Sequence, residues 1–505
     1  MLIQQFPDRA LFERLALDHN VIPVWAEILA DTETPVSLLS KFLQSSGPRF
    51  LFESVEGGER WGRYSFLGVS ARSHVRVYRD TVEVEALDRR KEIAHQGDPL
   101  KVLRELMRSY RAAQINGLPR FWGGLVGYLT YEMISFFEKI PNRYPAQKPL
   151  AHFIIPDAML IFDNIRHSLL IVVICFLDET VSAATAYPAA CARIRSLLEV
   201  MEAPLRDRGK SEPAPASTLH TPLQPADYRK RVQKVKKHIR AGDIIQTVIS
   251  QPFVCKAPPD LWALYRAQRY INPSPYLYFL RLDHMSLIGS SPETMVRLEN
   301  RMATLRPIAG TRPRGKTEQA DRELADELLQ DEKERAEHLM LVDLGRNDLG
   351  RVATTGTVQV TDLMVIERYS HVMHLVSNIT CDLRPECDPW DLLKATFPAG
   401  TLSGAPKIRA MEIIAQLETN PRGPYGGAVG YISFNGNMDL AITIRTACVE
   451  EDLLTVRAGA GIVADSDPET EHRETVNKAM AIQKALMLLQ DHPDPEGIPS
   501  NDHHD

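Results

Sequence analysis

The chain has 505 residues, 44% of them hydrophobic and 25% charged, which is the composition of an ordinary globular protein with two or three domains. Its formal net charge of −6 gives no support for binding to nucleic acid or to an anionic membrane surface. The six cysteines are scattered and form no CxxC pair, so neither a zinc site nor a disulfide framework is expected, and a reducing compartment fits best.

The first two hundred residues predict a mixture of helices and short strands. A helical start is predicted over residues 1–30, and further helices over 31–42 (after a loop), 100–113 and 182–201. Strands are predicted over 49–53, 64–69, 74–84, 121–131, 158–162 and 168–176. Charges from Asp8 onward come too early for a signal peptide, and the longest apolar run, 169–177, is too short to cross a bilayer. We therefore expect a cytoplasmic protein.

Residues 204–225 are rich in proline and polar side chains and show no hydrophobic period, which is typical of a linker. This segment divides the chain into an N-terminal domain over 1–203 and a second domain over 226–489. The tail, 490–505, is rich in Pro, Asp and His and is predicted to be disordered.

Beyond the linker the predicted strands outnumber the helices. Helices are predicted over 226–240, 332–349, 403–417 and 470–489, and strands over 246–255, 276–282, 287–290, 295–299, 302–305, 356–360, 371–380, 426–434, 438–448 and 453–458. Asn435-Gly436 is a strong hairpin signal. The six residues from Gly123 resemble the six from Gly426, which suggests a related sheet core in both halves. Without regular βαβ alternation, the pattern predicts an α+β fold, with large antiparallel β-sheets in a sandwich-like core and helices outside.

Two pairs of glutamates are candidates for chemistry. Glu334 and Glu337 stand three apart beside an apolar run, and Glu471 and Glu474 repeat this spacing at the start of a later helix. Carboxylates at the edge of a buried segment need a partner or a metal, and two such helix faces suit an oxygen-liganded ion such as Mg²⁺. The alternative is two unrelated solvated faces that pair with neighbouring lysines and arginines.

Glycine-dense segments lie near both pairs. Residues 308–315, 397–407 and 457–462 predict loops whose backbone N–H groups form anion sites, although each alone could be a tight turn. Arg445, near a strand end, suits a carboxylate, whereas His374 lies on an apolar strand, where a lone histidine is usually a core residue. These residues predict a Mg²⁺-dependent site for a small polyanionic molecule.

Five long motifs follow one another in the chain. They are PIAGTRPRG at 307–315, AEHLMLVDLGRNDLGRV at 336–352, FPAGTLSGAPK at 397–407, GPYGGAVGYISFNGNMDLAITIRT at 423–446 and AGAGIVADSDPETEHRETVNKA at 458–479. They resemble the chorismate-utilising enzymes, and among these most closely the anthranilate synthase component I family. The resemblance covers nearly the whole chain and is strongest over 226–488. It implies a lyase of tryptophan biosynthesis: ammonia adds to carbon 2 of chorismate, the carbon-4 hydroxyl leaves, and pyruvate is eliminated to give anthranilate.

The resemblance also implies a role for each matching position. Glu337 and Glu474 match the Mg²⁺ ligands, with Glu334 and Glu471 as their neighbours. The matching catalytic residues are Glu293 as the general acid for the leaving hydroxyl, His374 in pyruvate elimination, and Gln246 and Thr401 as further active-site contacts. The matching chorismate-binding residues are Gly310, Thr311, Tyr425, Arg445, Gly459, Ala460, Gly461 and Lys478.

Two positions separate related reactions. Aminodeoxychorismate synthases resemble this chain but carry a nucleophilic lysine where it has Ala309. Isochorismate and salicylate synthases carry a lysine base where it has Gln246, which cannot act as a base at neutral pH. Both differences favour ammonia as the nucleophile. The SQPF segment at 250–253 departs from the family, in which basic residues follow the serine. The alternatives are a salicylate or isochorismate synthase and an inactive, tryptophan-sensing subunit.

Two further motifs resemble the tryptophan feedback site of the family, although the first alone could be an ordinary strand end. LFES at 51–54 and NPSPYL at 272–277 imply an inhibitor site, with Phe52 and Leu277 as apolar departures. The implied tryptophan-binding residues are Glu53, Ser54, Pro275, Tyr276 and Leu277. No cysteine lies in the Gly-x-Cys-x-Gly elbow of a glutaminase. The resemblance therefore implies that ammonia comes from a separate glutamine amidotransferase subunit, anthranilate synthase component II, within a heterotetramer.

Overall fold

A computed structural model describes residues 2–43, 46–54, 62–86, 89–205, 217–369 and 372–490. Half of the predicted linker (206–216) and nearly all of the predicted disordered tail lie outside these residues, so both stay predictions. Among the described helices, none is long and apolar enough to cross a membrane.

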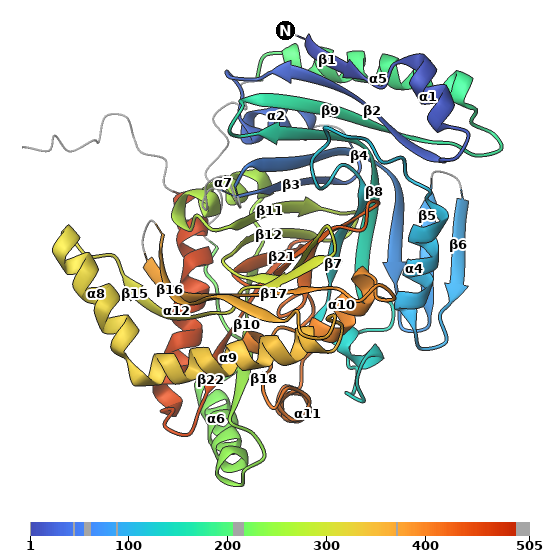
Figure 1. The fold of residues 1–505 in the computed structure, drawn as a ribbon. Coiled ribbons are helices and arrows are strands. Elements are labelled where there is room, and N and C mark those ends of the chain that lie inside the picture. Colours follow the sequence, from blue (N-terminus) through green and yellow to red (C-terminus); the bar gives the residue numbers. More distant parts are fainter. Residues whose placement is uncertain are drawn as a thin grey trace, which may run out of the picture.

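The strands form two facing antiparallel layers (Figure 1). The first layer runs through β4 (Tyr64–Val77), β3 (Arg49–Glu53), β11 (Tyr276–Arg281), β12 (Ser286–Ser291), β21 (Thr446–Glu450), β22 (Leu453–Ile462), β10 (Gln246–Lys256) and β18 (Gly404–Ala405). The second runs through β8 (Ala151–Asp163), β7 (Gly124–Leu129), β19 (Ala428–Ser433), β20 (Met438–Ile442), β13 (Thr294–Glu299), β14 (Met302–Leu305) and β17 (Val372–Asp382). β17 also pairs with β15 (Ile308–Pro313) and β16 (Gln359–Arg368). The predicted α+β fold with a sandwich-like core is confirmed.

The pairing of β4 with β8 joins the two layers at one edge. Beyond this pairing, the sheet continues from β8 through β9 (Ser168–Phe176) and β2 (Val21–Leu29) to β1 (Leu2–Phe6). It continues from β4 through β5 (Thr81–Ala86) to β6 (Arg89–Ala94). Apolar residues of both layers fill the space between them. Phe121 stacks on Tyr431 at 4.0 Å between ring centroids, and Phe66 meets both rings edge-on. Burial of such surfaces is the main force that holds the layers together.

Helices cover the outside of the sandwich. α7 (Leu261–Ile271) and α12 (Pro468–Leu488) pack together behind the first layer, beside α6 (Pro225–Arg240). α9 (Glu332–Gly350) packs against β15 and β17 and runs across the open end of the sandwich (Figure 1). The remaining helices are α1 (Arg9–Leu15), α2 (Pro35–Phe42), α4 (Pro99–Ser109), η1 (Tyr131–Phe136), α5 (Ala183–Glu202), α8 (Glu318–Gln330), α10 (Pro389–Thr396), η2 (Gly400–Leu402) and α11 (Lys407–Leu417).

In each layer, strands of the first sequence half adjoin strands of the second half at one junction. β3 pairs with β11, and β7 pairs with β19, so the two GG-x-V-G-Y segments lie side by side. Gly127 stands directly opposite Gly430 in this pairing. A Cβ at Gly127 would come within 2.0 Å of the His152 carbonyl oxygen, and one at Gly430 within 2.1 Å of that of Asp439. Only glycine therefore permits the close approach of β7 to β8 and of β19 to β20 at these positions. The division into domains at 204–225 stays a prediction.

Three predictions of local structure were wrong. Residues 1–30 contain two strands around the short helix α1, because β2 is buried between β1 and β9 and is apolar at nearly every position, which hides the period of two. The glycine-dense segments 308–315 and 457–462 are mainly strands, β15 and β22, rather than loops. Their glycines serve close contacts within the sheet. The helix predicted from 403 begins only at Lys407, because Pro406 precedes it as the N-cap.

Candidate active site

A cavity of about 510 Å³ lies at the end of the sandwich covered by α9 and α12. Its wall contains all the predicted catalytic, substrate and metal residues except one. They are Gln246, Glu293, Gly310, Thr311, Glu334, Glu337, His374, Thr401, Tyr425, Arg445, Gly459, Gly461, Glu471, Glu474 and Lys478. The exception is Ala460, which is fully buried in the apolar core and does not line the cavity. Segments far apart in the sequence thus meet around one space large enough for a small ligand.

Four carboxylates enter the cavity from the first turns of two helices. Asp331 caps α9 and fixes its start by accepting hydrogen bonds from two backbone N–H groups. Burial raises the pKa of Glu334, against the opposing effect of Arg312, and the charge of Glu337 raises it further. Burial likewise raises the pKa of Glu471, and Glu474 acts in the same direction. The carboxylates repel one another, which is the electrostatic condition for binding a divalent cation.

Glu293 lies in the wall of the cavity in a strongly desolvated position. Its side chain is buried between β12 and β13, and its Oε1 accepts a hydrogen bond of 2.9 Å from Thr401 Oγ1. Burial raises the pKa of Glu293 to about 8, although the Thr401 hydroxyl and the charge of Arg445 oppose the rise. At neutral pH this carboxyl therefore holds a proton that it can donate.

His374 is held in one orientation by β15. Its Nδ1 lies 3.0 Å from Thr311 Oγ1 and 3.2 Å from the carbonyl oxygen of Gly310. Burial lowers the pKa of His374, so the imidazole is neutral. Because the Gly310 carbonyl oxygen can only accept a hydrogen bond, Nδ1 carries the hydrogen, and the other ring nitrogen, Nε2, is left as the basic atom. His374 is thus a neutral base in the cavity wall, beside the predicted substrate-binding residues, rather than an ordinary core histidine.

Glycines of β22 bring the backbone close to the other side chains of the cavity. Gln246 Nε2 donates to Glu337 Oε1 at 3.1 Å, and a Cβ on Gly461 would come within 2.6 Å of that nitrogen. A Cβ on Gly459 would come within 2.7 Å of the Tyr425 hydroxyl. Lys478 Nζ donates to the Gly459 carbonyl oxygen at 3.0 Å and pairs with Glu474 at 2.6 Å. β22 and α12 are therefore linked through one lysine.

Arg445 approaches the cavity from the turn between β20 and β21. Its backbone has a φ of +50°, an uncommon value for a residue with a side chain. The Arg445 carbonyl oxygen accepts a hydrogen bond of 2.7 Å from Gln268 Nε2, which holds this turn in place. Burial lowers the pKa of Arg445, and Glu293 is the nearby acidic group that opposes this effect. A carboxylate ligand would offset the desolvation of the guanidinium group.

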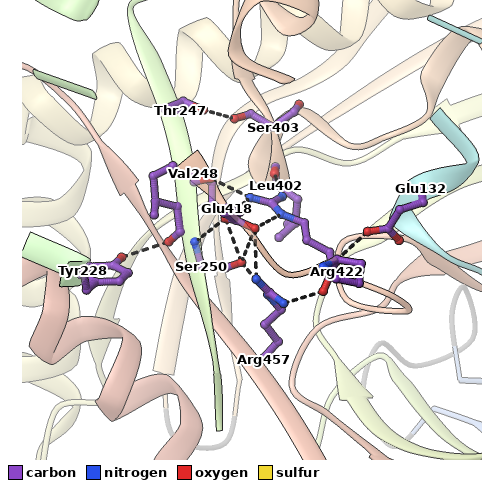
Figure 2. A network of polar contacts seen from close by, with 12 residues as sticks. Glu132, Tyr228, Thr247, Val248, Ser250, Leu402, Ser403, Glu418, Arg422 and Arg457 are labelled. Carbon is purple, nitrogen blue, oxygen red and sulfur yellow. Dashed lines mark hydrogen bonds and ion pairs between the residues drawn. The ribbon is translucent and has the colours of Figure 1, made fainter. Parts of the chain in front are cut away.

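A buried ionic network lies behind the cavity (Figure 2). Glu418 accepts hydrogen bonds from Arg422, from Arg457 and from the Ser250 hydroxyl, with donor–acceptor distances of 2.8–3.2 Å. Glu132 accepts from the backbone N–H groups of Arg422 and Gly423, at 2.6 and 3.0 Å. Sequence reasoning missed this network, because an i,i+4 Glu–Arg pair is ordinary on helices. It fixes the loop before Tyr425, and Arg457 lines the cavity itself.

A second, smaller cavity of about 50 Å³ contains the predicted inhibitor-binding residues. Its lining includes Glu53, Ser54, Pro275, Tyr276 and Leu277. Glu53 is held by Arg269, at 2.6 Å, and by the Tyr265 hydroxyl. The Tyr276 hydroxyl reaches across the sandwich to Asp439 Oδ1 at 2.8 Å. The LFES and NPSPYL motifs thus converge on one space between the layers.

Comparison with known proteins gives the family. Residues 48–484 match the model of the chorismate binding enzymes. The chain belongs to the chorismate binding enzyme family. Anthranilate synthase component 1 of Acetivibrio thermocellus is 46% identical over 94% of this chain and 96% of that protein, and its counterpart from Aquifex aeolicus is 45% identical over 95% and 97%. The predicted resemblance is confirmed.

Solved structures agree with the architecture of the family. Anthranilate synthase component I from Streptococcus pneumoniae superposes with a TM-score of 0.73, at 35% identity, over 90% of this chain and 98% of that one. The isochorismate synthase MenF from Escherichia coli superposes with a TM-score of 0.67 over 94% and 98%. At 19% identity, the MenF likeness concerns the fold alone.

Proposed function

We propose that the chain converts chorismate and ammonia into anthranilate, pyruvate and water, as the large component of an anthranilate synthase in tryptophan biosynthesis. The proposal rests above all on one observation: a proton-donating Glu293 and a neutral His374 share a cavity with four carboxylates. The names of the near-full-length relatives support it. Gln246 and Ala309 favour ammonia over water or a lysine amine as the nucleophile, because neither position offers a basic side chain.

The donor set of the cavity fits a magnesium ion. Glu337 and Glu474 would hold Mg²⁺, and Glu334 and Glu471 would orient them or bound waters. The fit is supported by the mutual repulsion of these carboxylates, which raises the pKa of Glu334 and Glu471, and by the preference of Mg²⁺ for oxygen ligands. When bound, the ion supplies positive charge that holds a carboxylate of chorismate.

The protein residues then carry the proton transfers. Arg445 and the backbone of Gly310, Gly459 and Gly461 orient the substrate. Glu293 gives its proton to the carbon-4 hydroxyl, which leaves as water while ammonia adds at carbon 2. His374 lies where its Nε2 can assist the second step, in which carbon 2 loses its proton and the enolpyruvyl C–O bond breaks. Aromatisation of the ring drives this elimination, and the released enolate takes up a proton at carbon to become pyruvate.

Partner and regulation are part of the same proposal. The name "component 1" of the relatives implies a companion subunit, and we propose a glutamine amidotransferase that supplies ammonia in a cytoplasmic heterotetramer. Tryptophan would bind in the small cavity around Glu53 and Tyr276 and inhibit the reaction. The position of this cavity between the layers supports a role in regulation, because both layers contribute to its wall.

The test is a direct assay of the purified chain with chorismate, Mg²⁺ and ammonium, with and without tryptophan. We expect anthranilate fluorescence that requires both ammonium and Mg²⁺ and falls when tryptophan is added. Turnover of chorismate that does not depend on ammonium, with isochorismate or salicylate as the product, would overturn the assignment. Ammonium-dependent activity that tryptophan leaves unchanged would remove only the regulatory part.

A further inference from the structure

Three potential metal ligands meet outside both cavities, where β4, β8 and the turn between β11 and β12 come together. His74 Nδ1 lies 3.0 Å from His152 Nε2 and 3.3 Å from Asp283 Oδ2. One ligand atom from each residue lies within 4.8 Å of the other two. Around a tetrahedral ion with bonds of about 2.0–2.1 Å, neighbouring ligand atoms are about 3.3 Å apart. Two of the three separations are therefore close to those of a four-coordinate metal site.

His152 is fully buried and directs its Nε2 at His74 Nδ1. Metal binding through Nε2 would leave Nδ1, which has no hydrogen-bond partner among the described residues, as the N–H of the ring. A neutral imidazole binds a metal through the lone pair of one ring nitrogen.

The charges around the cluster favour a cation. Arg76 pairs with Asp283, Glu83 and Glu85, and Arg90 pairs with Glu83. Three carboxylates thus face two guanidinium groups, which leaves one negative charge in excess. Asp283 is partly exposed, with 43% of its side chain accessible, so an ion can enter from solvent and keep a water ligand. Glu83 and Glu85 compensate the charge of Arg76, which would otherwise repel a metal.

We propose that His74, His152 and Asp283 bind a transition-metal dication of the zinc type, with water in the fourth position. Two imidazole nitrogens and one carboxylate suit Zn²⁺, Co²⁺ or Ni²⁺, whereas Mg²⁺ prefers oxygen ligands alone. The site therefore differs chemically from the carboxylate cavity. Because the histidines belong to the first half of the chain and Asp283 to the second, the ion links the two halves. Cysteine spacing had argued against zinc, but these ligands are too far apart in sequence to form a motif.

The test uses the full chain, stripped with a chelator and dialysed into excess Mg²⁺ so that the carboxylate cavity is occupied. Addition of Co²⁺ is expected to give one bound equivalent with visible d–d absorption bands. These bands should disappear when Zn²⁺ is added and displaces the Co²⁺. His74→Gln and Asp283→Asn should each weaken Co²⁺ binding at least about 100-fold. Asp283 lies in a partly exposed turn, so its variant keeps the test informative even where the His74 variant fails to fold.

The matched control is His238→Gln. His238 Nδ1 lies 2.7 Å from Asp243 Oδ2, which is also a contact between a histidine and an aspartate, but no third ligand from the described part of the chain joins it. This variant should bind Co²⁺ as the unmodified chain does. If the unmodified chain binds no more Co²⁺ in excess Mg²⁺ than Asp283→Asn does, the proposal is wrong, and the two imidazoles are simply hydrogen-bonded to each other.

Discussion

The hydrogen bond from Thr401 to Glu293 predicts the direction in which a single substitution shifts the pH profile. The Thr401 hydroxyl donates to the carboxylate at 2.9 Å and so favours its ionised form. A hydrogen bond to a charged group contributes about 1.5–3 kcal/mol, and one pKa unit corresponds to about 1.4 kcal/mol. Because the hydroxyl also contacts the protonated carboxyl, we take the lower end of this energy range, about 1.5 kcal/mol. Thr401→Val should therefore raise the pKa of Glu293 by about one unit, from about 8 to about 9.

The sign of the effect follows from the role of Glu293 as an acid. Activity requires its protonated form, which is present below the pKa and is lost as the pH rises through it. We expect kcat/KM for chorismate to fall above about pH 8 in the unmodified chain and above about pH 9 in Thr401→Val. The assay follows anthranilate fluorescence with the concentration of free ammonia held constant, because ammonium itself titrates at alkaline pH.

Two control variants isolate the hydrogen bond. Thr401→Ser keeps the hydroxyl, so the fall of kcat/KM at alkaline pH (the alkaline limb of the profile) should stay at its original pH. Thr443→Val makes the same chemical change at a buried threonine whose hydroxyl has no partner in the described structure, and it should leave the limb in place. An alkaline limb that stays unmoved in Thr401→Val, or shifts to lower pH, would refute the assignment of this pKa to Glu293.

Three further predictions concern the metal, the substrate wall and the buried network. Glu474→Gln should weaken Mg²⁺ binding, measured by calorimetry, at least about tenfold, because one charged ligand is lost. Gly461→Ala should reduce kcat/KM for ammonia about 10–100-fold with the fold retained, because the new methyl group displaces Gln246 from Glu337. Glu418→Gln should lower the free energy of unfolding by about 3–5 kcal/mol, seen as a lower melting temperature, because buried arginines lose their counter-charge.

For each of these three variants, the same substitution at another position serves as a control. Glu469→Gln lies on the same helix as Glu474 but pairs with a surface arginine, so Mg²⁺ binding should not change. Gly350→Ala adds a methyl group where no atom lies within 4 Å, and its kinetics should match the unmodified chain. Glu412→Gln removes an exposed pair on α11 and should cost less than about 1 kcal/mol. Equal effects in a variant and its control would contradict the corresponding prediction.

The separate parts of the site could be predicted from sequence because each has a local signature. The Glu-x-x-Glu spacing of α9 and of α12 holds within one helix, and the family motifs are continuous segments. The contact of Thr401 with Glu293 has no such signature, since it depends on how η2 approaches the turn between β12 and β13. For the same reason the raised pKa of Glu293, which comes from burial, could not be predicted.

Other features depend on burial that sequence patterns do not reveal. Glu418 and Arg422 have the spacing of an ordinary surface pair, yet both are buried, and Arg457 joins them from a distant strand. The glycines of 457–462 suggested a loop, whereas they allow side chains to approach a central strand closely. The strand over Val21–Leu29 is apolar on both faces, so its period was hidden.

The direct pairing of early with late strands in each layer has a consequence for synthesis of the chain. One edge of β7 pairs with β8, but the other can pair only after β19 has been synthesised, about 300 residues later. At a translation rate of about 5–20 residues per second, this strand waits roughly 15–60 s for its neighbour. β3 waits for β11 in the same way. During this interval the nascent chain exposes unpaired apolar strands that can associate with other chains. Yield in a cell should therefore depend on chaperones and on slow growth at low temperature more than on the stability of the finished protein.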